Sequence, residues 1–382
     1  MRIVDVNGFH AEAGGGVRRY VEAKFAAAAR AGHSLRVVAP GTESRVETRD
    51  GGDVAWVASP VMPFDPRYRR FAAPGPVWEA IDAFAPDVVE ASSPWGSAAI
   101  AAAWPGRAAR ALVFHQDVVA AYGHTALDRW LPPPAIDALA APWWARLRRL
   151  SKRFDVTVAG GEWLAARLAA HGVRNALAIP FGIEAGRFAP ERRDRTLRAE
   201  LLARCGAPPT GRLLLAVSRF HPEKRLPTVI DAFARANSVR GDLGLALVGG
   251  GLAHASVERA ARQAGSVVLL GAIEDRDALA RHFASADLFV HGSAAETFGL
   301  AVAEAMASGV PVVVPDAGGA ADLAARGYSK VYRAGNAADA TRAILAALAG
   351  KAAPPSKPPP ASLEDHFMAL FGTYEQLRGH NT

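Results

Sequence analysis

Short apolar runs rich in β-branched residues alternate with alanine-rich segments, and this alternation most limits what the chain can fold into. The runs before residue 160 are RIVDV, SLRVVAP, DVAWVAS, PDVVEAS, ARALVFH and DVTVAG. Those after residue 210 are RLLLAVS, LGLALVGG, SVVLLGAI, ADLFVHGS and VPVVVPD. Unbroken apolar strands separated by helices are typical of parallel sheets that are covered on both faces. Two such series in tandem predict an α/β protein with two doubly wound, Rossmann-like domains.

Two segments rich in proline, glycine or charge interrupt the pattern. The first, 179–194, predicts a boundary between a domain 1–182 and a domain 183–350. The second, 351–362, has too much proline for regular structure. Residues 363–382 beyond it carry apolar side chains at helical spacing, and we expect this helix to cross back to the first domain.

Composition limits the partners and the compartment. Half of the 382 residues are hydrophobic, which is enough for two cores. The formal charge of +7 favours an anionic partner such as a nucleotide or an anionic membrane face. The basic residues follow no known nucleic-acid reader motif, so we expect no nucleic acid. A single cysteine, Cys205, no signal peptide and no apolar run of about 18 residues together predict a cytoplasmic protein.

Three consecutive glycines, Gly14 to Gly16, follow the first predicted strand and open a helix. Glycines let the backbone approach a phosphate closely, and a helix N-terminus offers free N–H groups and the positive end of the helix dipole. The run matches neither G-x-G-x-x-G nor the P-loop pattern. Ligand binding and an ordinary flexible loop therefore both remain open at this position.

Two cations and one apolar residue follow predicted strands of the second domain. Arg219 and Lys224 come after RLLLAVS, and Ile273 comes after the strand that ends at Gly271. At the carboxyl end of a parallel strand, side chains face the crevice where ligands bind in such folds. A guanidinium and an ammonium suit a diphosphate, and backbone groups near Ile273 can read a nucleotide base. The alternatives are two solvated cations and an ordinary capped loop.

Glu296 and Glu304 flank an apolar run in SAAETFGLAVAEAMASGVPVVVPDAGG, where we expect a helix from about Phe298 or Gly299. Residues eight apart on a helix differ by about 12 Å in rise. An acid and base that cleave one glycosidic bond need a separation of about 5–10 Å. We therefore interpret Glu296 and Glu304 as ligands for sugar and ribose hydroxyls, with the amides of Phe298, Gly299 and Leu300 on phosphate between them. The alternative is an N-terminal cap and a locally paired core acid.

Together these motifs resemble family 4 of the retaining, nucleotide-sugar-dependent glycosyltransferases. The resemblance rests on GGGVRRY, SRFHPEKR, ETFGLAVAE and EAMASGVPVVVPDAGG in this order, and it covers nearly the whole chain. It implies the GT-B fold, in which two Rossmann-like domains face a central cleft. It also implies transfer with retention from a UDP- or GDP-sugar, without a resident cofactor or metal.

The resemblance implies roles for individual residues. Arg219 and Lys224 are expected to bind the donor diphosphate, and the loop of Gly15 and Gly16 to close over donor and acceptor. His115, at the end of ARALVFH, matches the first-domain histidine that faces the sugar in many members. The chain also departs from the usual pattern. Arg225 stands where glycine is common after the lysine, HGS replaces Pro-Ser, and Asp322 replaces a glutamate.

The first domain of this family carries the acceptor side. Here it contains RYRRF (67–71) and WWARLRRLSKRF (143–154), and the second places tryptophans beside cations. Such a segment is typical of interfacial membrane binding, although inward packing of the tryptophans is the alternative. We expect a lipid or lipid-linked acceptor, as for phosphatidylinositol mannosyltransferases, and a peripheral position on an anionic inner leaflet. A soluble saccharide acceptor, a sugar-nucleotide epimerase and a non-catalytic binder remain alternatives.

Overall fold

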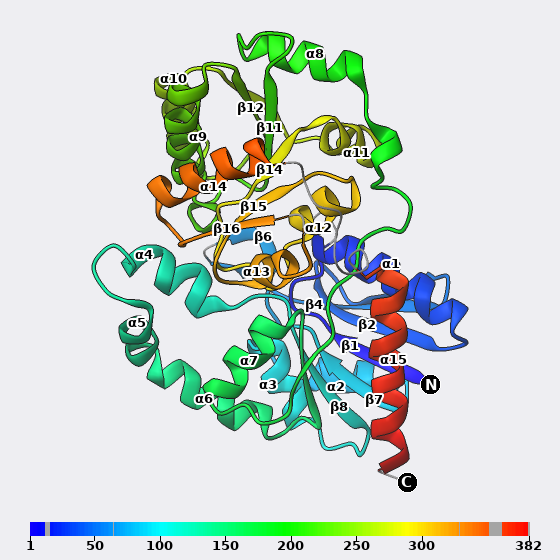
Figure 1. The fold of residues 1–382 in the computed structure, drawn as a ribbon. Helices are drawn as coiled ribbons and strands as arrows, with labels where there is room; N and C mark the ends of the chain where they lie inside the picture. The colour runs from blue at the N-terminus through cyan, green and yellow to red at the C-terminus, as the bar shows by residue number, and fades with distance from the viewer. Residues whose placement is uncertain (12–15, 64, 328, 351–360, 381–382) are drawn as a thin grey trace. The chain divides into compact units, whose positions relative to one another are not determined.

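The computed structural model describes residues 1–11, 16–63, 65–327, 329–350 and 361–380 (Figure 1). The chain divides into two compact units. The first comprises Met1–Gln116, Asp137–Pro180 and Leu363–Thr382, and the second comprises Asp117–Ile136 and Phe181–Ser362. The segment Asp117–Ile136 groups with the second unit, although the sequence prediction placed it inside a continuous domain 1–182.

An eight-stranded sheet in the order β10-β9-β8-β7-β1-β2-β4-β3 forms the centre of the first unit. Its strands are β1 (Arg2–Val6), β2 (Ser34–Gly41), β3 (Arg45–Arg49), β4 (Gly52–Ala58), β7 (Val88–Ala91), β8 (Ala109–Phe114), β9 (Val156–Ala159) and β10 (Ala176–Ala178). All neighbours are parallel except β3, which pairs antiparallel with β4 at the edge. A small second sheet pairs β5 (Val61–Met62) with β6 (Asp65–Arg69).

The helices of the first unit come mainly between its strands. They are α1 (Gly16–Arg30), α2 (Gly75–Asp82), α3 (Gly96–Ala103), α6 (Ala141–Ser151), α7 (Glu162–Ala170) and α15 (Leu363–His380). Helix α15 packs beside α1 (Figure 1). Its side chains Phe367, Leu370, Phe371 and Tyr374 lie in the same buried cluster as the strands of the first sheet.

A six-stranded, wholly parallel sheet in the order β13-β12-β11-β14-β15-β16 forms the centre of the second unit. Its strands are β11 (Arg212–Val217), β12 (Leu243–Val248), β13 (Val267–Gly271), β14 (Leu288–Val290), β15 (Val312–Pro315) and β16 (Ser329–Tyr332). Its helices are α8 (Arg195–Arg204), α9 (Leu226–Arg240), α10 (His254–Ala264), α11 (Arg276–Ser285), α12 (Leu300–Ala307), α13 (Gly319–Ala324) and α14 (Ala337–Ala349). The prediction of two doubly wound, largely parallel units is thus confirmed.

Short helical turns fill the connections. A π-helical turn (Val119–His124) leads into α4 (Thr125–Leu127), and α5 (Pro133–Leu139) follows. Two 3₁₀ turns, Pro190–Arg192 and Pro222–Lys224, lie in the second unit.

Each sheet has one point at which the strand order reverses. In the first unit β1 lies between β2 and β7, and in the second unit β11 lies between β12 and β14. Loops that leave two such neighbouring strands diverge to opposite faces of the sheet, which opens a crevice at the carboxyl edge where ligands bind. A ligand-binding site is therefore expected at the loops after β1 and β7, or at those after β11 and β14.

For the segment 143–154, the structure favours the alternative in which the apolar side chains pack inward. Trp144, Leu147 and Leu150 of α6 are buried within the first unit, and the indole of Trp144 stacks on His171 at 3.8 Å between ring centroids. Trp143 is only half-buried and packs against the exposed Trp95, and Arg148 and Arg149 are exposed. Among the described helices, none is both long and apolar enough to cross a bilayer.

Candidate functional site

Four candidate residues of the second unit lie on loops at the carboxyl edge of its sheet. Arg219 and Lys224 follow β11, Ile273 follows β13, and Glu296 follows β14. Because β11 and β14 are neighbours at the reversal of strand order, Lys224 and Glu296 come together there although 72 residues separate them in sequence.

Lys224 and Glu296 form the centre of this site. The Lys224 Nζ donates to Glu296 Oε1 at 2.8 Å and lies 3.2 Å from Glu223 Oε1. The imidazole of His291 approaches the same Glu296 oxygen at 3.5 Å. The side chains of Lys224 and Glu296 remain 12% and 22% exposed, so both are accessible from solvent at this edge of the sheet.

Electrostatics keep this pair ionised. Burial acts to raise the pKa of Glu296, but Lys224 and His291 outweigh it and hold that pKa at about 2. Burial acts to lower the pKa of Lys224, but Glu296 and Glu223 outweigh it and the pKa is raised. Burial lowers the pKa of His291 to about 4, so this imidazole is neutral at pH 7. Glu296 is therefore a permanent acceptor of hydrogen bonds and cannot act as a general acid near neutrality.

Arg219 differs from Lys224 in its surroundings. Its side chain is 75% exposed, and its guanidinium lies 3.4 Å from Glu223 Oε1. Glu223 is itself buried, so one carboxylate orients both cations of the loop. This arrangement places two positive groups at the carboxyl end of β11, as the sequence predicted for an anionic ligand.

The turn after Glu296 is shaped by glycines. The predicted helix begins at Leu300 rather than at Phe298 or Gly299, because Gly299 has φ +90°, a left-handed conformation that does not continue into a helix. A Cβ on Gly319 would lie 2.6 Å from the backbone of Phe298, and the Gly319 amide donates to the Glu296 carbonyl at 2.7 Å. The DAGG sequence therefore supports the turn that carries Glu296.

The backbone amides at the start of α12 are available to donate hydrogen bonds to a ligand. Within the described part of the chain, no hydrogen bond uses the amide of Phe298, Gly299 or Leu300. The Phe298 side chain is buried, and its ring packs edge-on against Phe181, whereas Leu300 is half-exposed. These amides remain candidates for contacts with phosphate or sugar oxygens.

Glu304 forms an ion pair with an arginine side chain, and the sequence did not predict this pairing. Arg276, at the start of α11, donates to Glu304 Oε1 at 2.6 Å, and its guanidinium also lies 3.6 Å from Glu184. Ile273 is half-buried three residues before Arg276. The helical spacing used for Glu296 and Glu304 does not apply, because Glu296 precedes α12. Each acid is positioned by a separate basic partner.

Arg225 adopts an unusual backbone conformation. Its φ of +48° and ψ of +37° are left-handed, a conformation that glycine adopts more easily than arginine. Its guanidinium pairs with Asp128 Oδ2 at 2.5 Å. The ring of Tyr122 also packs edge-on against His221 of the same loop. The segment 117–136 is thus tied to the loop that carries Arg219 and Lys224.

His115 lies directly after β8, in the first unit. It packs edge-on against Tyr20, whose hydroxyl lies 2.9 Å from His366 Nε2 on α15. Burial lowers the pKa of His115 to about 4, so its ring is neutral at pH 7. Gly16 is the first residue of α1, as predicted, and Gly15 lies outside the described residues.

Two glycines of the second unit were also missed by sequence reasoning. A Cβ on Gly249 would lie 1.8 Å from the Ser218 carbonyl oxygen, and one on Gly251 would lie 2.7 Å from that of Phe220. Both have positive φ, so the glycine run after β12 packs directly against the cationic loop after β11. Three consecutive glycines after a predicted strand were the available signal.

Family models match both units of the chain. Residues 14–187 match the model described as Glycosyltransferase Family 4, and residues 198–357 match the model described as Glycosyl transferases group 1. These ranges include nearly every candidate residue discussed above.

Individual proteins are similar over most of the chain. A GDP-mannose-dependent alpha-mannosyltransferase of Mycobacterium tuberculosis is 33% identical over 299 residues, which cover 77% of this chain and 73% of that protein. A GDP-mannose-dependent alpha-(1-6)-phosphatidylinositol dimannoside mannosyltransferase of the same species is 30% identical, with 82% and 79% covered. Among solved structures, sucrose-phosphate synthase from Thermosynechococcus elongatus has a TM-score of 0.71 at 19% identity and covers 100% of this chain and 97% of its own.

Proposed function

Because this chain belongs to the glycosyltransferases of family 4, we propose that it transfers mannose from GDP-mannose to a hydroxyl group of a lipid-linked acceptor. The chain is a nucleotide-sugar-dependent glycosyltransferase with the GT-B fold. The choice of GDP-mannose is supported by the names of the two mycobacterial relatives. The choice of a lipid acceptor is supported by the name of the second relative, which includes phosphatidylinositol dimannoside.

The ionised Lys224–Glu296 pair carries the proposal at the level of the site. The diphosphate gains negative charge as the bond to the sugar breaks, and cations fixed near it stabilise that charge. We assign this role to Lys224 and Arg219, with the amides of Phe298, Gly299 and Leu300 as further donors. Glu296 accepts hydrogen bonds from sugar hydroxyls, and Glu304, oriented by Arg276, accepts them from the ribose.

The same residues suggest how the bond between the sugar and the diphosphate is replaced by a bond to the acceptor. The acceptor hydroxyl forms the new bond to the anomeric carbon on the face from which the diphosphate departs, and its proton passes to the departing diphosphate. The stereochemistry is then retained. Glu296 is unsuited to donate a proton because its pKa is about 2, which supports a positioning role for it. In the first unit, neutral His115 beside Tyr20 is assigned to contact the transferred sugar.

Peripheral binding to an anionic membrane is a further part of the proposal, and it rests on cations because Trp144, Leu147 and Leu150 of α6 are buried. Its cations Arg148 and Arg149 are exposed, as are Lys152 and Arg153 just beyond it, and exposed cations favour an anionic surface. Flotation with vesicles that contain anionic lipid tests this step. Binding that falls as salt rises supports it, whereas no binding at low salt contradicts it.

A product assay tests the proposed function. The purified protein is incubated with GDP-mannose, UDP-glucose, UDP-galactose or ADP-glucose, with and without a bacterial lipid extract, and the products are identified by mass spectrometry. We expect a hexose added to lipid with GDP-mannose alone, and an α-linkage by NMR. Transfer only to soluble saccharides would reject the lipid acceptor. Conversion of the donor without any acceptor would favour an epimerase, and an inverted linkage would reject retention.

A further inference from the structure

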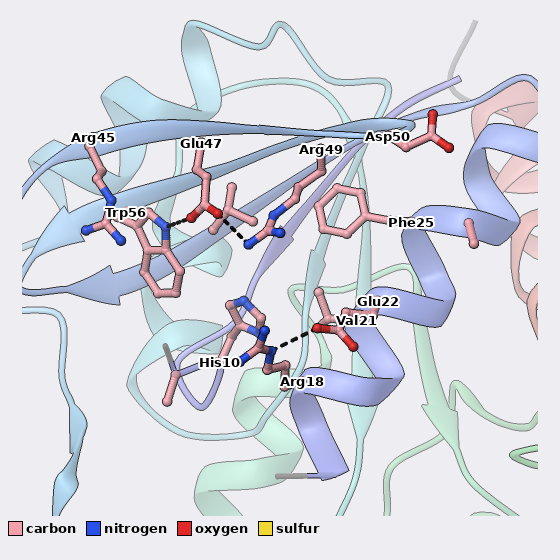
Figure 2. Close-up of a pocket in the computed structure, with 13 residues that line it drawn as sticks. His10, Arg18, Val21, Glu22, Phe25, Arg45, Glu47, Arg49, Asp50 and Trp56 are labelled. Carbon is pink, nitrogen blue, oxygen red and sulfur yellow. Dashed lines mark hydrogen bonds and ion pairs between the residues drawn. The ribbon is translucent and has the colours of Figure 1, made fainter. Parts of the chain in front are cut away.

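A pocket of about 530 Å³ lies in the first unit and is lined by none of the residues assigned above. Its walls come from the loop after β1, from helix α1, from the edge strand β3 and from its neighbour β4 (Figure 2). The volume is in the range of small-molecule sites, about 300–1,000 Å³.

The inner surface of the pocket is apolar and partly aromatic. Val21 and Phe25 of α1 face Val54 and Trp56 of β4, and all four are buried. Figure 2 shows the Trp56 indole and the Phe25 ring on opposite sides of the pocket. Surfaces of this kind bind the apolar face of a ring-shaped ligand.

The rim of the pocket is charged. Arg45, Glu47 and Arg49 alternate along β3 and line the pocket together, whereas Val46 between them lies 61% exposed. Arg18 and Glu22, one helical turn apart on α1, pair at 2.8 Å across from them. With Asp50, the lining holds three guanidinium groups and three carboxylates, so its formal charge is zero.

His10 contributes an unsatisfied polar atom to this lining. It is 6% exposed and stacks on Trp56 at 5.4 Å between ring centroids, and its Nδ1 makes no hydrogen bond within the described residues. Burial, followed by the neighbouring arginines, lowers its pKa to about 4, so the ring is neutral at pH 7. A buried polar atom without a partner costs free energy, and a bound hydroxyl group would remove that cost.

These features select among ligand classes. The carboxylates and the zero net charge disfavour a phosphate or another polyanion, and the six charged groups disfavour an acyl chain. A neutral ring with hydroxyl groups fits, because its C–H face suits Trp56 and Phe25 while its hydroxyls both donate to carboxylates and accept from guanidinium groups.

We propose that this pocket is a carbohydrate subsite that holds a neutral sugar unit of the acceptor, apart from the hydroxyl that reacts. The assignment of the sugar to the acceptor rests on the proposed function. The pocket borders the glycine loop along the chain, since His10 precedes the glycines and Arg18 follows them.

Binding without donor tests the subsite separately from transfer. The full chain is titrated with α-1,6-mannobiose, methyl α-mannoside and inorganic phosphate, by calorimetry and by tryptophan fluorescence. We expect saturable binding of mannobiose with a dissociation constant on the order of 1 mM. Glu47→Gln, Arg49→Gln and His10→Phe should each weaken it at least about fivefold, which corresponds to about 1 kcal/mol. His10→Phe retains an aromatic ring against Trp56 but lacks Nδ1.

Val46→Thr is the matched control, because it changes the opposite face of β3 and should leave affinity unchanged. Thermal unfolding of each variant shows whether it folds. No saccharide binding by the wild-type chain, equal affinity in all folded variants, or tighter binding of phosphate than of mannobiose would overturn the subsite. Unchanged saccharide binding in a chain that transfers no sugar would instead reject the proposed function and leave the subsite standing.

Discussion

At the scale of single residues, the two acids of the site, Glu296 and Glu304, form ion pairs with different basic residues. Glu296 is held by Lys224, and Glu304 by Arg276. The two acids therefore have separate surroundings and are expected to act on separate parts of the donor. Substitution of each one should change a different measured quantity.

We expect Glu304→Gln to weaken binding of GDP by about tenfold or more, because a hydrogen bond to a charged group contributes about 1.5–3 kcal/mol. Glu296→Gln should leave GDP affinity within about threefold and lower kcat at least about tenfold. Calorimetry with GDP and initial rates with GDP-mannose measure the two effects. Full activity in both variants would contradict the assigned roles.

The Lys224–Glu296 pair also predicts how stability depends on pH. The pKa of Glu296 falls from 4.5 to about 2 on folding, so its contribution is complete above about pH 4.5 and is lost as the pH falls toward 2. The free energy of unfolding, measured by urea denaturation, should decline over this range in the wild-type protein. The decline should be smaller in Glu296→Gln, and an identical decline would show that the pair is not ionised as described.

At the scale of elements, the position of the segment 117–136 depends on Arg225, whose backbone conformation is unusual. Arg225 stands in a left-handed conformation, which costs about 1 kcal/mol relative to glycine, and pairs with Asp128. Arg225 therefore carries this conformational cost, but it also forms an ion pair with Asp128 that glycine could not form. The pair therefore fixes this segment against the donor loop at little net gain in stability.

Arg225→Gly tests this interpretation. The overall free energy of unfolding should change by less than about 1 kcal/mol, because relief of strain offsets loss of the ion pair. Hydrogen exchange of residues 119–127 should become faster, and Asp128→Asn should have the same effect without adding to it. Arg240→Gln, which breaks the exposed pair with Asp242, is the control and should leave this segment protected. Unchanged exchange in Arg225→Gly would rule out the tie.

At the scale of the whole molecule, positive charge is available where the proposed chemistry requires it. The chain carries a formal charge of +7, and Arg219, Lys224 and the amides before α12 gather at the edge of the second sheet. We expect EDTA to leave the transfer rate within about twofold, because these groups stabilise the departing diphosphate without a divalent ion. Loss of activity that Mg²⁺ or Mn²⁺ restores would contradict this prediction.

Much of the fold was predictable because buried parallel strands need unbroken apolar sequence. β1, β7 and β11 were identified in this way, whereas β3, with the sequence RVETR, was not. An exposed edge strand has no continuous apolar signal. The same reasoning placed Arg219, Lys224 and Ile273 at strand ends, since the position of a loop follows from the order of the strands around it.

The sequence by itself determined the two sheets, the loops at their carboxyl edges and the residue types that those loops carry, since these follow from local periodicity and chain order. Only the tertiary structure decided which side chains meet. It paired Glu304 with Arg276, turned Trp144 inward, and brought His10 and Trp56 together in one pocket. Contacts between distant segments depend on how strands are ordered and helices packed, and no local pattern records that information.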